Sequence, residues 1–358
     1  MIGRRALQNA ASLVHLQLPD TVTSIGEYAC AALPVLESVQ LPQSLQTIGY
    51  RAFYGDEALA DITLPEGTAS VGRAAFQGCL ALQSVSIPSS LQFLGQAAFA
   101  ECPSLQTFTV AAGCGACMLN GNVLLSADGR TLLAVPEGAG TFVKVPDGVE
   151  TIAYGAFSGA ASIKMAELPA SVRRIENYAF YNCTGLMNLV LPDTLEYVGS
   201  RAFGSSTMMF MDDYERAAVE TLQLGASVDH VAPFAFNGLN LTAFSVAETN
   251  PWYASVSGFL ANKAGDTLLE APAGLTGTVT IPEGVTALRE GLFTDNINVT
   301  DFILPDTLQT IPENAFPVSG YDTSTGETVP EYAITFHCSA GSAAAAYAEK
   351  HGITWTEA

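Results

Sequence analysis

One stretch of this sequence decides its fold. It runs from Leu36 to Phe53 as LESVQLPQSLQTIGYRAF, and it returns as LADITLPEGTASVGRAAF at residues 59–76. The proline of this stretch recurs at a step of 23 residues in three series: Pro19, Pro42, Pro65 and Pro88, then Pro146, Pro169 and Pro192, then Pro282 and Pro305. A fixed period of about 20 to 50 residues is typical of a solenoid, in which each repeat buries its apolar face only against its neighbours.

Each repeat predicts one strand, one turn and one short helical piece. Val39 and Leu41 lie two residues apart, which places alternate side chains of a short strand in the core. Pro42 ends this strand, because proline is tolerated only at strand margins. We expect the segment from Ile48 to Phe53 to form a tight turn or one helical turn, with the phenylalanine as its large core residue.

The composition excludes some partners. The chain has 14 Lys and Arg against 35 Asp and Glu, for a net charge of −21. Affinity for nucleic acid comes from basic side chains that displace counterions, so we expect neither nucleic acid nor an anionic membrane surface as a partner. No stretch approaches the roughly 18 consecutive apolar residues of a membrane helix, so we expect no membrane insertion by this segment.

Two interruptions of the period share one pattern. The intervals from Ala111 to Pro146 and from Ala247 to Pro282 both hold apolar strands around a Gly-containing turn. This pattern predicts two inserted β-hairpins, at about residues 113–136 and 249–272. We expect loop insertions at about residues 205–215 and 318–331, a solenoid over residues 1–340, and a C-terminal cap over residues 341–358.

The repeat pattern resembles a known family. The order Leu-x-x-Val-x-Leu-Pro, then Leu-x-x-Ile-Gly, then Ala-Phe-x-x-Cys is similar to the BspA-like, or treponemal-type, leucine-rich repeat, and the resemblance covers nearly the whole chain. It implies an α+β repeat fold, namely a right-handed leucine-rich-repeat solenoid with a parallel β-sheet on one face and short helical turns on the other. Gly225 and Ala247 depart from the pattern, since they stand at proline positions.

The residues that could carry chemistry occupy repeat positions or stand alone. Cys79, Cys102 and Cys183 each follow a repeat proline at the same distance, which favours buried core thiols. Cys114 and Cys117 form a lone CxxC, which is open to three readings: ordinary turn residues, a local disulfide or a redox pair. The histidines have no metal-ligand spacing, and no nucleophile elbow or phosphate loop is present. We therefore expect no catalytic residue, no metal, no cofactor and no enzyme activity.

A binding surface is then the expected place for function. The outward residues of the predicted strands form a polar, neutral ladder, which is either a solvated sheet face or a shallow platform for a partner. Aromatic, aliphatic and charged side chains interrupt this ladder and form the first candidate site: Phe142, Lys144, Met165, Glu167 and Val190. A second candidate is an apolar run that either packs back on the solenoid or forms a contact patch: Met208, Met209, Phe210 and Met211.

The resemblance implies an extracellular or cell-surface module. Members of the family are largely bacterial surface or secreted proteins, implicated in adhesion to host matrix proteins, other cells and surfaces. We therefore predict adhesion or recognition of a protein or glycan partner, which includes the host extracellular matrix. The alternative is a structural spacer that presents another domain away from the cell envelope. The sequence begins in mid-repeat with no signal peptide, so we expect that its start, with any export signal, was removed or lost.

Overall fold

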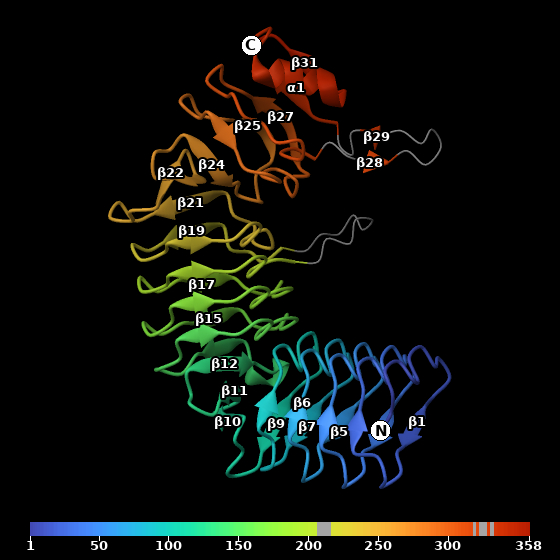
Figure 1. The fold of residues 1–358 in the computed structure, drawn as a ribbon. Coiled ribbons are helices and arrows are strands. Elements are labelled where there is room, and N and C mark those ends of the chain that lie inside the picture. The colour runs from blue at the N-terminus through green and yellow to red at the C-terminus, as the bar shows by residue number, and fades with distance from the viewer. Residues whose placement is uncertain (206–215, 318–319, 322–327, 330–332) are drawn as a thin grey trace.

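The chain forms a solenoid of short parallel strands with very little helix. The computed structural model describes residues 1–205, 216–317, 320–321, 328–329 and 333–358. Figure 1 shows the strands stacked along two arms that meet at an elbow. The lower arm runs from the N-terminus to β9 (Thr107–Val110), and the other rises from β12 (Thr131–Ala134) to the C-terminus.

The first family of strands is the one that the sequence predicts before each proline position. These strands pair in parallel in several short sheets. They are β1 (His15–Gln17), β3 (Ser38–Gln40), β5 (Asp61–Thr63), β7 (Ser84–Ile87), β9, β13 (Phe142–Lys144), β15 (Met165–Glu167), β17 (Asn188–Val190), β19 (Thr221–Leu224), β21 (Ala243–Val246), β25 (Gly277–Thr280), β27 (Val299–Ile303) and β30 (Thr335–His337).

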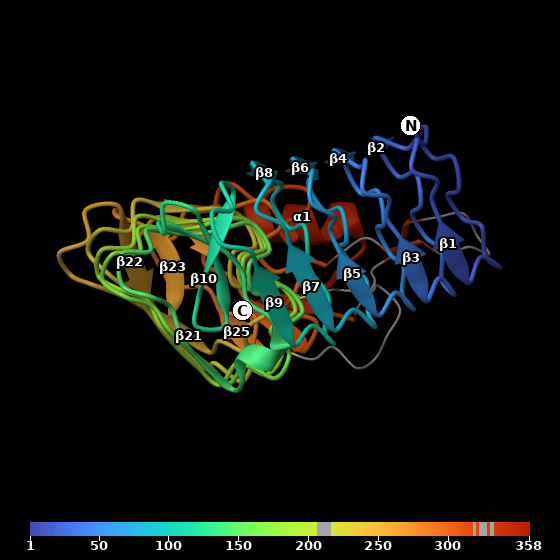
Figure 2. The same cartoon turned by 90° about the horizontal axis from the view of Figure 1, so that it is seen from below.

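A second family of parallel strands, which the sequence did not predict, lies after the proline in most repeats. Each has two residues, of which the second is generally buried: β2 (Ser24–Ile25), β4 (Thr47–Ile48), β6 (Ser70–Val71), β8 (Phe93–Leu94), β14 (Thr151–Ile152), β16 (Arg174–Ile175), β18 (Tyr197–Val198), β20 (His230–Val231) and β26 (Ala287–Leu288). Figure 2 shows β2 to β8 along a different side of the lower arm from β1 to β9. Many successive turns are therefore bonded to each other through strands of both families.

The expected helical turn before each core phenylalanine is not confirmed, because the described structure has turns of another kind there. The residue two positions before the phenylalanine lies in the left-handed region, with φ of 50° at Arg51, 57° at Ala74 and 58° at Tyr178. A right-handed helix cannot pass through such a residue. The backbone groups of this segment form hydrogen bonds with the next turn of the solenoid instead. The amide of Phe53 donates to the carbonyl of Ala75 at 2.8 Å.

A column of glycines lets successive turns approach each other. The amide of Gly72 donates to the carbonyl of Ile48 at 2.8 Å, and the amide of Gly95 donates to Val71 at 2.8 Å. A Cβ at Gly95 would lie 2.2 Å from the backbone nitrogen of Arg73. Any side chain here would therefore push two turns apart.

Antiparallel strands occur where the period is interrupted. In the first region β10 (Cys117–Asn120), β11 (Val123–Ser126) and β12 pair antiparallel in that order, and β12 continues in parallel to β14. In the second, β22 (Tyr253–Val256), β23 (Phe259–Asn262) and β24 (Thr267–Glu270) pair in the same way, and β24 continues to β26. These strands extend the second family of sheets.

The middle antiparallel strands separate the core into three clusters. Leu124 packs in the N-terminal cluster, whereas its neighbours Val123 and Leu125 pack in the central one. Likewise Leu260 packs in the central cluster and Phe259 in the C-terminal one. Because side chains of a strand alternate between its faces, β11 and β23 are each buried on both sides.

Helix is confined to two described segments. A 3₁₀ turn, η1 (Glu137–Ala139), lies at the elbow, where the amide of Gly138 donates to the carbonyl of Leu105 at 3.1 Å. Helix α1 (Ala343–His351) lies near the C-terminus, and the Ser342 hydroxyl accepts the amide of Ala345 at its start. After it, β31 (Thr354–Thr356) pairs in parallel with β30. The short strands β28 (Gly320–Tyr321) and β29 (Thr328–Val329) pair antiparallel.

Candidate binding surface on the exposed sheet

The structure brings the first set of predicted site residues together on one sheet face. Strands β13, β15 and β17 pair in parallel, so that Phe142 lies beside Met165, and Lys144, Glu167 and Val190 form a row. In each strand the middle residue is buried and the two outer residues are exposed. We call these exposed side chains, with Asn188, the platform.

The platform is apolar for an exposed surface. The exposed fraction is 47% for Phe142, 37% for Met165 and 70% for Val190. The Nζ of Lys144 lies 3.5 Å from a carboxylate oxygen of Glu167, and both side chains are more than half exposed. Such a surface ion pair contributes about 0–1 kcal/mol, so it orients the two side chains more than it stabilises the fold.

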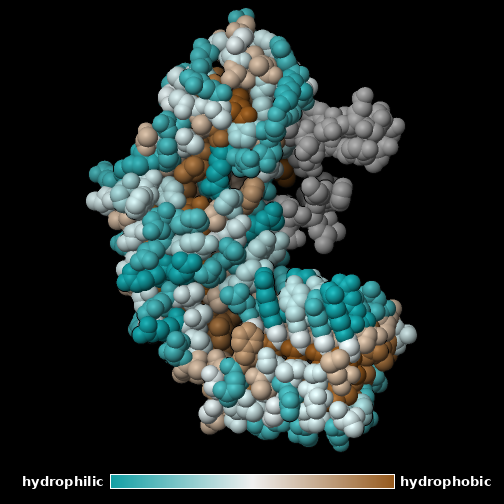
Figure 3. Space-filling model, viewed as in Figure 1, coloured by the Kyte–Doolittle hydropathy of each residue, from teal (hydrophilic) through white to brown (hydrophobic). Residues whose placement is uncertain are grey.

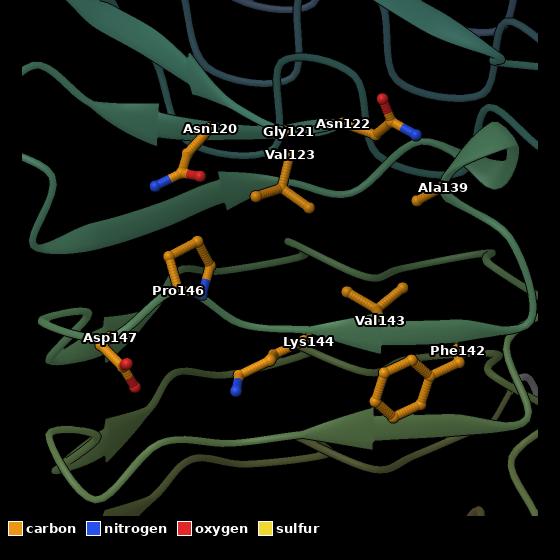
Figure 4. Close-up of a pocket in the computed structure, with 10 residues that line it drawn as sticks. All are labelled: Asn120, Gly121, Asn122, Val123, Ala139, Phe142, Val143, Lys144, Pro146 and Asp147. Carbon is orange, nitrogen blue, oxygen red and sulfur yellow. The ribbon is translucent and has the colours of Figure 1, made fainter.

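Two hollows adjoin the platform. The larger, of about 540 Å³, lies between β13 and the turn from β10 to β11. Figure 4 shows Phe142, Val143 and Lys144 along one wall and Asn120 and Val123 along the other. The smaller, of about 140 Å³, is lined by residues of β15 and β17 and by Leu168 and Pro192, which follow these strands. An elongated partner laid across the three strands would reach both hollows.

Sequence reasoning missed the wall formed by Asn120, Gly121 and Asn122. The Asn-Gly dipeptide was an available turn signal, since Gly121 has φ of 59° and lies between two antiparallel strands. The sequence could not show that this turn lies near Phe142, because their proximity depends on how the antiparallel strands pack against the next turn. The second predicted set, Met208, Met209, Phe210 and Met211, lies outside the described residues.

The cysteines line the core. All seven are free thiols. Cys79, Cys102 and Cys183 are buried, and their thiols lie 3.1–3.2 Å from the carbonyl oxygens of core phenylalanines in the preceding turn. Burial raises the pKa of Cys102 to about 12, which leaves its thiol protonated and unreactive at neutral pH. The thiols of Cys114 and Cys117 lie 3.7 Å apart.

Two buried carboxyl groups have strongly raised pKa values, and both have structural partners. Asp56 accepts the amide of Leu33 at 2.9 Å, and burial raises its pKa to about 8. Burial raises the pKa of Glu270 to about 7, against the opposing effect of Arg289 at 3.1 Å. Neither lines the platform or its hollows.

Metal sites and membrane spans were also sought in the described part of the chain. It contains no group of three or more His, Cys, Asp or Glu side chains that could hold a metal ion. No helix within it has the length and apolar character needed to cross a bilayer.

The fold resembles those of several solved structures, including the following two. A pneumococcal vaccine antigen, PcpA, is 16% identical, with 96% of this chain and 79% of that chain covered and a TM-score of 0.54. A leucine-rich repeat protein from Eubacterium ventriosum is 17% identical, with 87% and 79% covered and a TM-score of 0.50. At these identities the likeness shows the fold alone. No curated protein matched the sequence significantly.

Comparison with known families gives a match over most of the chain. Residues 1–116, 140–213 and 274–325 match the BspA type leucine-rich repeat region in six copies. These segments include the lower arm and the strands of the platform. Because they cover more than half of the sequence, the chain belongs to the BspA-type leucine-rich-repeat family.

Proposed function

We propose that this chain is a non-enzymatic recognition module of a bacterial surface or secreted protein. In this proposal it adheres to a host matrix or cell-surface protein through the platform. The solenoid spans residues 1–340 and carries the site, and residues 341–358 close its C-terminal end. Membership of the BspA-type family supports a protein partner and a surface location.

One observation carries the proposal: an exposed apolar cluster on a sheet that is otherwise polar. The corresponding outer residues of the lower arm are small or polar, among them Ser38, Gln40, Asp61 and Thr63. The platform instead exposes an aromatic ring, a thioether and a valine beside one ion pair. Exposed apolar anchors beside hollows are typical of the residues that dominate binding energy at protein interfaces.

The test is a binding titration of the whole chain against immobilised fibronectin, fibrinogen and laminin at physiological salt. Saturable binding is expected for at least one of them, and Phe142→Ala with Val190→Ser should weaken it at least about tenfold. The matched control is Phe93→Ala, which removes an exposed ring of 57% accessibility from β8, away from the platform.

The alternative proposal is a structural spacer, and the elongated stack of turns in Figure 1 favours it. A spacer needs no anchor residues, so the platform variants would behave as the parent chain does in every assay. Absence of binding to all three matrix proteins would reject the matrix-adhesin proposal. Equal losses from Phe142→Ala and Phe93→Ala would reject the platform as its site.

A further inference from the structure

The inside corner of the elbow contains a second concave site, built by both arms. A cavity of about 310 Å³ is lined by Tyr54, Gln77 and Glu101 from turns of the lower arm and by Tyr154, Tyr178 and Tyr181 from turns of the other arm. The arms are bonded at this corner, where the amide of Glu101 donates to the carbonyl of Ser158 at 3.0 Å. This cavity shares no residue with the platform.

The aromatic side chains of the corner hold one another in place. The rings of Tyr154 and Tyr178 lie 5.3 Å apart, and those of Tyr178 and Tyr181 lie 5.1 Å apart and nearly perpendicular. Each of these tyrosines is half-buried. A ligand that enters therefore meets rings that are already ordered, which lowers the entropic cost of binding.

The charges around the cavity disfavour ionic ligands of either sign. The guanidinium of Arg51 lies 4.7 Å from the ring centre of Tyr54, and that of Arg73 lies 4.7 Å from that of Tyr154, so two positive charges already lie against rings of the lining and oppose a further cation nearby. An anion would face the carboxylate of Glu101, which accepts the amide of Gln77 at 2.9 Å. An uncharged ligand avoids both penalties.

The lining is also rich in hydrogen-bonding groups. Four tyrosine hydroxyls, one serine hydroxyl, two primary amides and one carboxylate line this single cavity, and together they include donors and acceptors. Figure 3 shows that the side of the lower arm that faces the other arm is hydrophilic. An apolar ligand would leave these groups without partners, at a cost of about 1–3 kcal/mol each.

We propose that the elbow cavity binds an uncharged saccharide. A pyranose presents hydroxyl groups around its edge and C–H groups on its faces, which matches polar side chains placed between aromatic rings. The volume suits one or two sugar rings, because ligand pockets begin at about 300 Å³.

The test uses saturation-transfer NMR and calorimetry on the whole chain with defined tetrasaccharides. The probes are cellotetraose, maltotetraose, mannotetraose and chitotetraose, with tetragalacturonate and tetramethylammonium as charged controls. The variants are Gln77→Ala, which leaves every ring in place, and Tyr181→Ala. The matched control is Tyr197→Ala, since Tyr197 packs on His230 and Arg174 away from the cavity.

Saturable binding of at least one neutral tetrasaccharide is expected. Gln77→Ala should weaken it about tenfold, the effect of losing one or two buried hydrogen bonds, and Tyr197→Ala should leave it unchanged. If no neutral probe binds, or if only a charged control does, the proposal is overturned. It is also overturned if Gln77→Ala and Tyr181→Ala bind as the parent does. None of these results bears on the matrix proteins tested against the platform.

Discussion

At the scale of single residues, the core phenylalanines form a stack that runs along the solenoid. The rings of Phe53 and Phe76 are nearly parallel at 5.2 Å, and those of Phe76 and Phe99 at 5.7 Å. Phe76→Ala should lower the free energy of unfolding of the lower arm by about 3–5 kcal/mol, because it opens a cavity that backbone hydrogen bonds keep from closing. Urea unfolding followed by circular dichroism measures this. Phe93→Ala is the exposed control, and an equal loss there would contradict the stack as the source of stability.

The buried carboxyl group of Asp56 makes stability depend on pH. Its folded pKa, about 8, lies above its unfolded value, so its contribution is complete below about pH 4 and is lost as pH rises through 8. Melting temperatures from pH 4 to pH 9 should therefore fall more steeply in the parent than in Asp56→Asn. The difference in free energy of unfolding between the two proteins should change by on the order of 1–3 kcal/mol between pH 4 and pH 9. Two parallel curves would show that Asp56 does not titrate in this range.

Residue patterns in the sequence grouped the five predicted platform side chains, whose role as a site stays a prediction, and gave no sign of the elbow cavity. Phe142 and Met165 could be assigned to one row, and Lys144, Glu167 and Val190 to another, because a constant repeat length places equivalent residues side by side. Tyr54 and Tyr154 lie in different arms, and no period relates them. Their position around one cavity depends on how the antiparallel strands redirect the stack, which is a property of three-dimensional packing.

At the scale of elements, β11 is a strand that belongs to two cores. Leu124 and Leu125 are adjacent and equally buried, yet they pack in the N-terminal and central clusters respectively. Leu124→Ala should therefore loosen the lower arm and Leu125→Ala the other arm, by about 2–5 kcal/mol in local opening energy. Native-state hydrogen exchange read by peptide measures both. If the two variants speed exchange in the same peptides, β11 does not separate the cores.

The strands that were predicted from the sequence show an alternation of apolar and polar residues, and those that were missed are too short to show one. Ser38–Gln40 has a half-buried apolar residue between two exposed polar ones and is followed by buried Leu41, which is a detectable alternation. Thr47–Ile48 has one buried residue and no alternation to detect.

The left-handed turns were missed for a different reason. Non-glycine residues such as Arg51 rarely adopt positive φ, and here hydrogen bonds to neighbouring turns hold them there.

At the scale of the whole molecule, net charge opposes the compact stack. The chain carries −21 over its 358 residues, and in the first 129 residues the basic side chains are Arg4, Arg5, Arg51 and Arg73. Raising sodium chloride from about 20 mM to about 300 mM shortens the screening length and should raise the melting temperature by a few degrees. Differential scanning calorimetry gives the shift. An unchanged melting temperature would mean that like charges lie too far apart to repel.

The strand pairing between successive turns also determines how the molecule responds to tension. Force applied between its two ends loads the turns in series, so each must break its pairing with the next before it releases length. One released turn of 23 residues frees about 80 Å of chain. Strands β11 and β23 lie between cores, and they resist longer because two clusters must open around them. Such a stack therefore yields in small increments under load and dissipates the applied force before the whole chain is extended.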